Sequence, residues 1–197
     1  MTTVSTKDVE RAAVKAANQL IGEFRSNPYA YLFESDLQMD LAARLREALP
    51  GSLHVPGMRG SSAGYELRLV YTEYLSKIDV ACLSPDRVAS ERFEPYGNWD
   101  LYLYEMPVHV GIELKYLKMG DRFDVSECLI DDAKLRRLGV TRHLVLGFVQ
   151  SDALVQRFWG TKHSAVHRTE LDGPQIPDLD AVYVASPTGL WQVRVDA

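Results

Sequence analysis

The chain has 197 residues, of which 46% are hydrophobic and 25% charged, a composition typical of a globular domain and not of a disordered segment. Its formal net charge of −5 argues against binding nucleic acid through overall positive charge. It contains no run of about 18 apolar residues, so we expect no transmembrane helix and no membrane partner. No signal peptide is visible at the start, and the two cysteines form neither a zinc motif nor a disulfide framework. We therefore expect a single cytoplasmic domain over residues 1–197.

Charge is unevenly distributed along the chain. Residues 131–170 contain seven lysines and arginines but only four acidic residues. A locally basic face on an acidic protein can still contact a phosphate backbone. An ordinary solvated surface explains the same pattern equally well.

The first third of the chain predicts two helices followed by a loop. Apolar residues recur at three- and four-residue steps over residues 6–25, which indicates a helix. A second helix is expected from about Pro28 to Leu49, with the proline near its first turn. Residues 51–64 are rich in Gly, Ser and Pro and predict a loop.

The middle of the chain predicts strands, because β-branched, leucine and aromatic residues are frequent there. The expected strands are 66–74, 77–83, 99–105 and 108–117. Residues 84–98 are polar and predict an insertion. The meander before the last of these strands implies antiparallel pairs.

The second half predicts helices and strands in alternation. The expected elements are a helix at 125–138, a strand at 143–149, a short helix at 152–159 and a C-terminal hairpin over about 181–195. The unit strand–helix–strand from 108 to 149 implies a parallel crossover. The sequence therefore predicts the α/β class, with a mixed central β-sheet flanked by helices.

Glu34 is a carboxylate at an apolar position of the second helix. At about 100° per residue, it falls in the middle of the apolar stripe, whereas the neighbouring aspartates fall on the opposite side. The stripe comprises Leu37, Leu41, Leu45 and Ala48. The alternative is a half-buried glutamate that the helix dipole favours at a helix start.

Two strands carry charges at positions that should be apolar. Asp79 lies inside KIDVACL, where a buried aspartate needs a partner or a metal, unless the strand is an edge and Asp79 reaches solvent. Glu113 and Lys115 share one face of the strand 108–117 with Gly111. Because the crossover helix should cover this strand, a solvent-exposed pair of charges is not expected there.

Three carboxylates and one lysine are the residue types of a site that hydrolyses phosphodiesters. Mg²⁺ binds through one or two carboxylates and keeps water ligands for a substrate phosphate. It polarises a phosphoryl oxygen and helps to generate hydroxide from bound water. A nearby lysine can orient that water or offset charge that develops on the phosphate.

Asp79 followed by Glu113-Leu114-Lys115 resembles the PD-(D/E)XK signature of the restriction-endonuclease-like nucleases. Glu34, in LFESDLQMDL, is similar to a helical glutamate that many members of this superfamily add. The resemblance covers about residues 29–150. It implies a restriction-endonuclease-like mixed sheet flanked by helices, with a metal site at one end of a strand pair.

The resemblance also implies a role for each matched residue. Asp79 and Glu113 would ligate Mg²⁺ or Mn²⁺, together with the backbone carbonyl of Leu114. Lys115 would position the attacking water or stabilise the pentavalent phosphate. Glu34 would hold a second metal ion or a metal-bound water.

Three further residues enter the expected site. Lys134 and Arg137 on the following helix are candidate phosphate contacts. Asp100 lies nearer than Asp79 to Glu113 in the sequence and is the alternative motif aspartate, in which case Asp79 is structural. The absence of a proline before Asp79 departs from the signature.

The implied function is a metal-dependent nuclease that hydrolyses phosphodiester bonds of nucleic acid, DNA foremost, in restriction, repair or mobile-element defence. The alternative is a catalytically inactive protein of the same fold that binds nucleic acid or a partner protein, and the low positive charge favours it. The family further implies a homodimer and a protein partner that supplies specificity.

Overall fold

The computed structural model describes residues 4–55, 65–74, 77–90, 106–160 and 166–195. Within these residues, seven strands form one mixed sheet in the order β3-β4-β5-β6-β8-β9-β7. Their bounds are β3 Val70–Tyr74, β4 Ile78–Leu83, β5 Val108–Leu117, β6 Arg142–Val149, β7 Val166–Glu170, β8 Ala181–Ala185 and β9 Leu190–Val195. A separate two-stranded sheet pairs β1 (Ser52–Val55) with β2 (Tyr65–Arg68).

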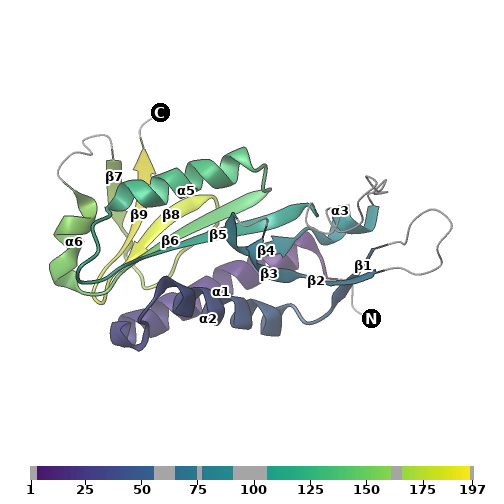
Figure 1. The fold of residues 1–197 in the computed structure, drawn as a ribbon, viewed down its shortest axis with the longest axis horizontal. Coiled ribbons are helices and arrows are strands. Elements are labelled where there is room, and N and C mark those ends of the chain that lie inside the picture. The colour runs from purple at the N-terminus through teal and green to yellow at the C-terminus, as the bar shows by residue number, and fades with distance from the viewer. Residues whose placement is uncertain (1–3, 56–64, 75–76, 91–105, 161–165, 196–197) are drawn as a thin grey trace.

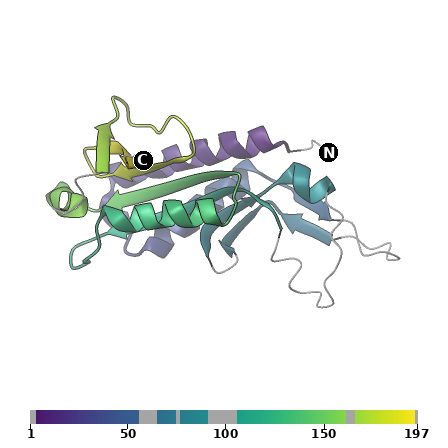
Figure 2. The same ribbon diagram turned by 90° about the horizontal axis from the view of Figure 1, so that it is seen from above.

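Helices cover both faces of the large sheet (Figure 1). Their bounds are α1 Thr6–Ser26, α2 Glu34–Ala48, α3 Pro85–Ser90, α5 Val125–Arg137 and α6 Asp152–Trp159, with a short 3₁₀ turn at Pro28–Ala30. Helices α1 and α2 lie on one side of the sheet and α5 lies on the other, and Figure 2 shows α1 and α5 on opposite sides of β6. The predicted α/β class with a mixed sheet flanked by helices is confirmed. No helix in the described ranges is long and apolar enough to cross a membrane.

The sheet contains both antiparallel and parallel pairs, as predicted. Strands β3, β4 and β5 pair antiparallel, and β5, β6 and β8 pair parallel, with α5 forming the crossover between β5 and β6. Strand β9 pairs antiparallel with both β8 and β7. The predicted strands at 77–83, 108–117 and 143–149, the helices at 125–138 and 152–159, and the C-terminal hairpin are all present within one or two residues.

Strand β5 is buried on both of its faces. Val110, Ile112 and Leu114 belong to the hydrophobic core formed with α1 and α2. On the opposite face, Gly111 leaves room for α5, because a Cβ atom there would lie 3.0 Å from the Leu135 Cδ2 atom. The close approach of α5 to β5 brings the polar side chains of that helix over the strand.

The second predicted helix begins later than expected. Pro28 starts a 3₁₀ turn, and α2 begins only at Glu34. The Asp36 carboxylate accepts the backbone N–H groups of Leu32 (2.8 Å) and Phe33 (2.9 Å), so Phe33 stays extended as the N-cap residue. This cap, and not Pro28, sets the helix start.

The strand predicted at 66–74 is wrong as a single element. It is interrupted at Leu69, which is buried and whose carbonyl accepts the Leu83 N–H group at 2.9 Å, so β2 and β3 belong to different sheets. The loop predicted at 51–64 is wrong at its start, where pairing with β2 makes Ser52–Val55 a strand despite its composition.

Two more elements differ from the predictions, and one predicted strand cannot be compared with the structure. Helix α3 occupies the start of the predicted polar insertion, and strand β7 was not predicted. The strand predicted at 99–105, which includes Asp100, lies outside the described residues.

We expect Gly111→Val to lower the free energy of unfolding by about 1–3 kcal/mol, because added methyl groups would overpack the contact with Leu135 and Val140. Urea denaturation measures the change. Gly22→Ala is the control, since nothing lies within 4 Å of a Cβ atom there and alanine favours a helix by about 0.5–1 kcal/mol. Wild-type stability of Gly111→Val would contradict the close approach of α5.

Candidate functional site

The pairing between β4 and β5 ends before β5 does. It runs from Leu83–Val108 to Val80–Ile112, whereas the pairing of β5 with β6 continues to Leu117–Val149. The last residues of β5 therefore present an unpaired backbone edge toward β4.

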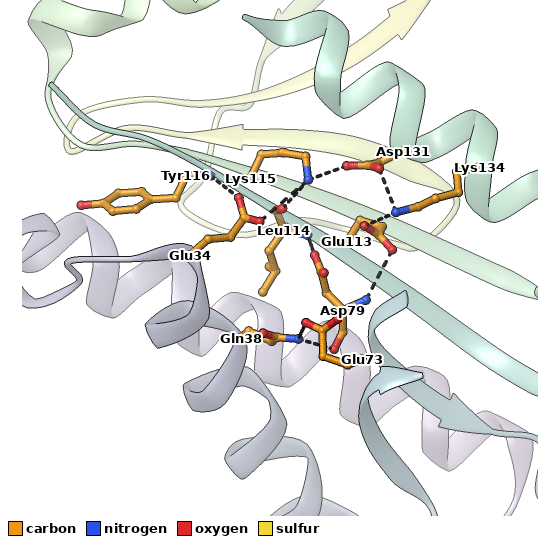
Figure 3. Close-up of polar contacts among 10 residues, drawn as sticks. All are labelled: Glu34, Gln38, Glu73, Asp79, Glu113, Leu114, Lys115, Tyr116, Asp131 and Lys134. Atoms are coloured by element: carbon orange, nitrogen blue, oxygen red, sulfur yellow. Dashed lines mark hydrogen bonds and ion pairs between the residues drawn. The ribbon is translucent and has the colours of Figure 1, made fainter. Parts of the chain in front are cut away.

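Carboxylates occupy this edge of β5 (Figure 3). Asp79 Oδ2 accepts the Leu114 N–H group at 2.8 Å, and Glu34 Oε2 accepts the Tyr116 N–H group at 3.1 Å. The Leu114 carbonyl oxygen lies at the same site, since Lys115 Nζ donates to it at 3.2 Å. Two acidic residues from separate elements are thus anchored to one strand edge.

Glu113 lies on the face of β5 that α5 covers, and its side chain is only 1% exposed. Its Oε2 atom lies 2.6 Å from Lys134 Nζ, and its Oε1 atom accepts the Asp79 backbone N–H group at 3.4 Å. The buried carboxylate therefore connects β4, β5 and α5.

Asp131 on α5 joins the two lysines of the site. Its Oδ2 atom lies 2.8 Å from Lys115 Nζ, and its Oδ1 atom lies 2.9 Å from Lys134 Nζ. Lys115 Nζ also lies 3.8 Å from Glu34 Oε1. Asp131 thus bridges the ammonium groups of Lys134 and Lys115, and Lys115 is the lysine of the predicted motif.

The sequence analysis did not select Asp131, although a signal for it existed. The buried residues of α5 are Val125, Cys128, Asp131 and Leu135, a regular series of three- and four-residue steps. The stripe argument that selected Glu34 also selects Asp131.

Gln38 is a second residue that the sequence analysis did not place in the site. Its Nε2 atom donates to the Asp79 carbonyl oxygen at 2.8 Å and to Glu73 Oε1 at 2.7 Å. It holds the backbone of β4 at Asp79, one turn along α2 from Glu34.

The structure brings most of the predicted site residues together. Glu34, Asp79, the Glu113–Lys115 segment and Lys134 form one cluster (Figure 3). Arg137 is exposed, and its Nε atom contacts the Ala133 carbonyl oxygen at 3.4 Å, on its own helix.

Carboxylates outnumber cations in this cluster. Burial raises the pKa of Glu34 and of Asp79 above their ordinary values. Burial and then the charge of Asp79 raise the pKa of Glu113 to about 7. These shifts arise mainly from burial, and they indicate that binding a proton at these carboxylates stabilises the folded state.

The pKa values of the two lysines are also raised, but by nearby carboxylates and not by burial. Burial alone would lower the pKa of Lys115, but its hydrogen bond to Asp131 and the charge of Glu34 raise that pKa well above its usual range. The hydrogen bonds to Glu113 and Asp131 likewise outweigh burial and raise the pKa of Lys134. Both side chains are therefore ammonium ions at neutral pH.

The oxygen atoms of the site are of the kind that bind a small divalent cation. Among the residues that the structure describes, no group of three or more His, Cys, Asp or Glu side chains is arranged to hold a metal ion. The site offers instead two carboxylates, of Asp79 and Glu113, and the Leu114 carbonyl. Mg²⁺ needs only one or two carboxylates and fills its other positions with water, so these oxygen donors fit Mg²⁺ or Mn²⁺.

Comparison of the chain with known protein families, curated proteins and solved structures finds no match. The function is therefore argued from the site itself.

We expect the stability of the wild-type protein to fall as the pH rises through about 7, in part because Glu113 must ionise while buried. A folded-state pKa raised from 4.5 to about 7 gives stability that is complete below pH 4.5 and lost above pH 7. In Glu113→Gln this loss disappears, which amounts to at most about 3 kcal/mol.

Urea denaturation at pH 5 and pH 8 measures this difference. Glu47→Gln, which changes an exposed glutamate of α2, is the control and should keep the wild-type pH dependence. An identical pH dependence in Glu113→Gln and the wild type would refute the assignment.

Proposed function

We propose that this protein is a metal-dependent nuclease of the PD-(D/E)XK type, with DNA as the expected substrate and Mg²⁺ or Mn²⁺ as cofactor. The observation that carries the proposal is that the Asp79 carboxylate, the Leu114 carbonyl and the buried Glu113 carboxylate lie around the last residues of β5, beside the ammonium group of Lys115. Burial of ionised carboxylates costs stability, and a cluster of them with shifted pKa values is therefore a candidate functional site.

In this proposal, Asp79, Glu113 and the Leu114 carbonyl would hold the metal ion. When bound, the ion polarises the phosphoryl group and lowers the pKa of its water. A water molecule would attack phosphorus and pass its proton to Glu34, the phosphorus–oxygen bond to the leaving sugar would break, and the leaving oxygen would take a proton from solvent.

Lys115 acts as a fixed cation and not as a base. Its raised pKa keeps it protonated, so it offsets negative charge on the phosphate in the transition state. Asp131 holds it in place through the contact of 2.8 Å.

Glu34 is the group that accepts the proton of the attacking water. Its side chain is 40% exposed, and it lies 3.8 Å from Lys115 Nζ, where water can reach it. Its pKa is raised by burial, which makes the carboxylate a stronger base than an exposed glutamate.

A catalytically inactive protein of the same fold, binding nucleic acid or a partner protein, is the second candidate. It is favoured by the ion pair of 2.6 Å between Lys134 and Glu113, which occupies one oxygen of a proposed metal ligand. In an active enzyme Lys134 shares that carboxylate with the metal ion or moves to a substrate phosphate.

Cleavage of labelled DNA and RNA in Mg²⁺ or Mn²⁺ tests the activity. We expect Glu113→Gln, Asp79→Asn and Lys115→Ala each to lower the rate by at least about 100-fold, since each removes a ligand or charge of the transition state. Glu47→Gln should cleave at the wild-type rate. Wild-type rates in both Glu113→Gln and Lys115→Ala would exclude this site.

Metal binding is measured separately by calorimetry and thermal unfolding. We expect Mg²⁺ to raise the midpoint of thermal unfolding and to release protons at pH 6, where the raised pKa leaves Glu113 largely protonated, but fewer at pH 8. Asp79→Asn should lose both effects. Absence of binding at millimolar Mg²⁺ with nucleic acid present would favour the inactive alternative.

A further inference from the structure

Large apolar side chains on the surface are concentrated beside the candidate site. The described residues expose six of them: Tyr29, Leu32, Phe33, Met39, Met119 and Ile130. Four of these, Tyr29, Leu32, Phe33 and Met119, belong to two short segments, and we name them the apolar rim. Exposed apolar groups gathered at one place commonly mark a binding surface.

The two segments of the rim are joined by direct contacts. Lys118 Nζ donates to the Leu32 carbonyl oxygen at 2.8 Å and lies 4.4 Å from the centre of the Phe33 ring. Tyr116 Oη donates to the Tyr31 carbonyl oxygen at 2.7 Å. The segment before α2 therefore packs against the end of β5, and Met119 lies just after that strand.

The rim is continuous with the site. Phe33 immediately precedes Glu34, whose carboxylate accepts the Tyr116 N–H group, and Lys118 lies three residues after Lys115, just beyond the end of β5. Nucleotides next to a phosphate in the site would therefore meet the rim first.

Phe33 is held in place without being part of the core. Its side chain is 58% exposed, yet Asp36 fixes its backbone N–H group and Lys118 lies over its ring. An aromatic ring fixed in this way loses little entropy when a flat partner stacks on it.

We propose, on the basis of the nuclease function above, that the substrate is single-stranded nucleic acid or an unpaired end, whose bases stack on the apolar rim at Phe33 and Tyr29. The chain carries a net charge of −5 and the site has surplus carboxylates, so phosphate contacts alone give little affinity. Stacking on aromatic rings supplies affinity without sequence preference, and it requires bases that are not already stacked in a duplex.

The test compares kcat/KM on one labelled sequence in Mg²⁺, as a single strand and as a duplex. We expect the single strand to be cleaved at least about tenfold more efficiently. Phe33→Ala should raise KM for the single strand by about tenfold with little change in kcat, and Phe33→Trp should restore it. The control is Met39→Ala, an equally exposed residue that lies about 140° around α2 from Glu34.

Fluorescence anisotropy with oligothymidylate and with a short duplex separates this proposal from the nuclease function. Strand-selective binding that depends on Phe33 without any cleavage supports the rim and refutes the nuclease. Cleavage of both forms with equal efficiency, or an equal loss on both in Phe33→Ala, overturns the rim. A change of oligomeric mass in Phe33→Ala with unchanged strand preference also overturns it, since the rim then joins two copies of the chain.

Discussion

The backbone edge of β5 beyond Ile112 is the constraint around which the site is organised. A buried N–H group without a partner costs free energy, and β4 no longer supplies partners for Leu114 and Tyr116. The carboxylates of Asp79 and Glu34 take that place. Both acids thus contribute to the fold and to the chemistry of the site. Along this same stretch, β5 pairs with β6 on one side, which holds the strand in place. Its other side, toward β4, has no strand partner within the described residues.

Positive and negative charges in the cluster are only partly balanced. Asp131 determines where the two lysine ammonium groups lie. Its two oxygens hold Lys115 and Lys134 on either side, so one buried residue of α5 positions both cations. The missing side chain at Gly111 lets α5 come close enough for these contacts. Burial raises the pKa of Asp79 and Glu113 even though lysines lie nearby, and a cluster with more carboxylates than lysines can accept a further cation.

Strong local patterns made the core of the fold predictable from the sequence. Strand β5, helix α5 and strand β6 agree with the expected ranges because each is a long apolar or periodic segment. The start of α2 was not predictable from Pro28, because the side chain of Asp36 caps the helix, which begins six residues later than the proline suggested. The contact of Gln38 with Asp79 depends on how α2 packs on β4, which no local pattern encodes. Asp131 was within reach, since it continues the buried stripe of α5.

The cap of α2 also links the proposed stacking surface to the proposed catalytic residues. Asp36 accepts the N–H groups of Leu32 and Phe33, and the residue that follows them, Glu34, carries the carboxylate at the edge of β5. A shift of this helix start would move the aromatic ring and the proposed base together. Lys118, just after β5, contacts the Leu32 carbonyl and the Phe33 ring, so the segment before α2 and the end of β5 are linked. A nucleic-acid strand that stacks on Phe33, as we propose, would thereby be placed in a fixed position relative to Glu34 and Lys115, and the helix cap would align its phosphate.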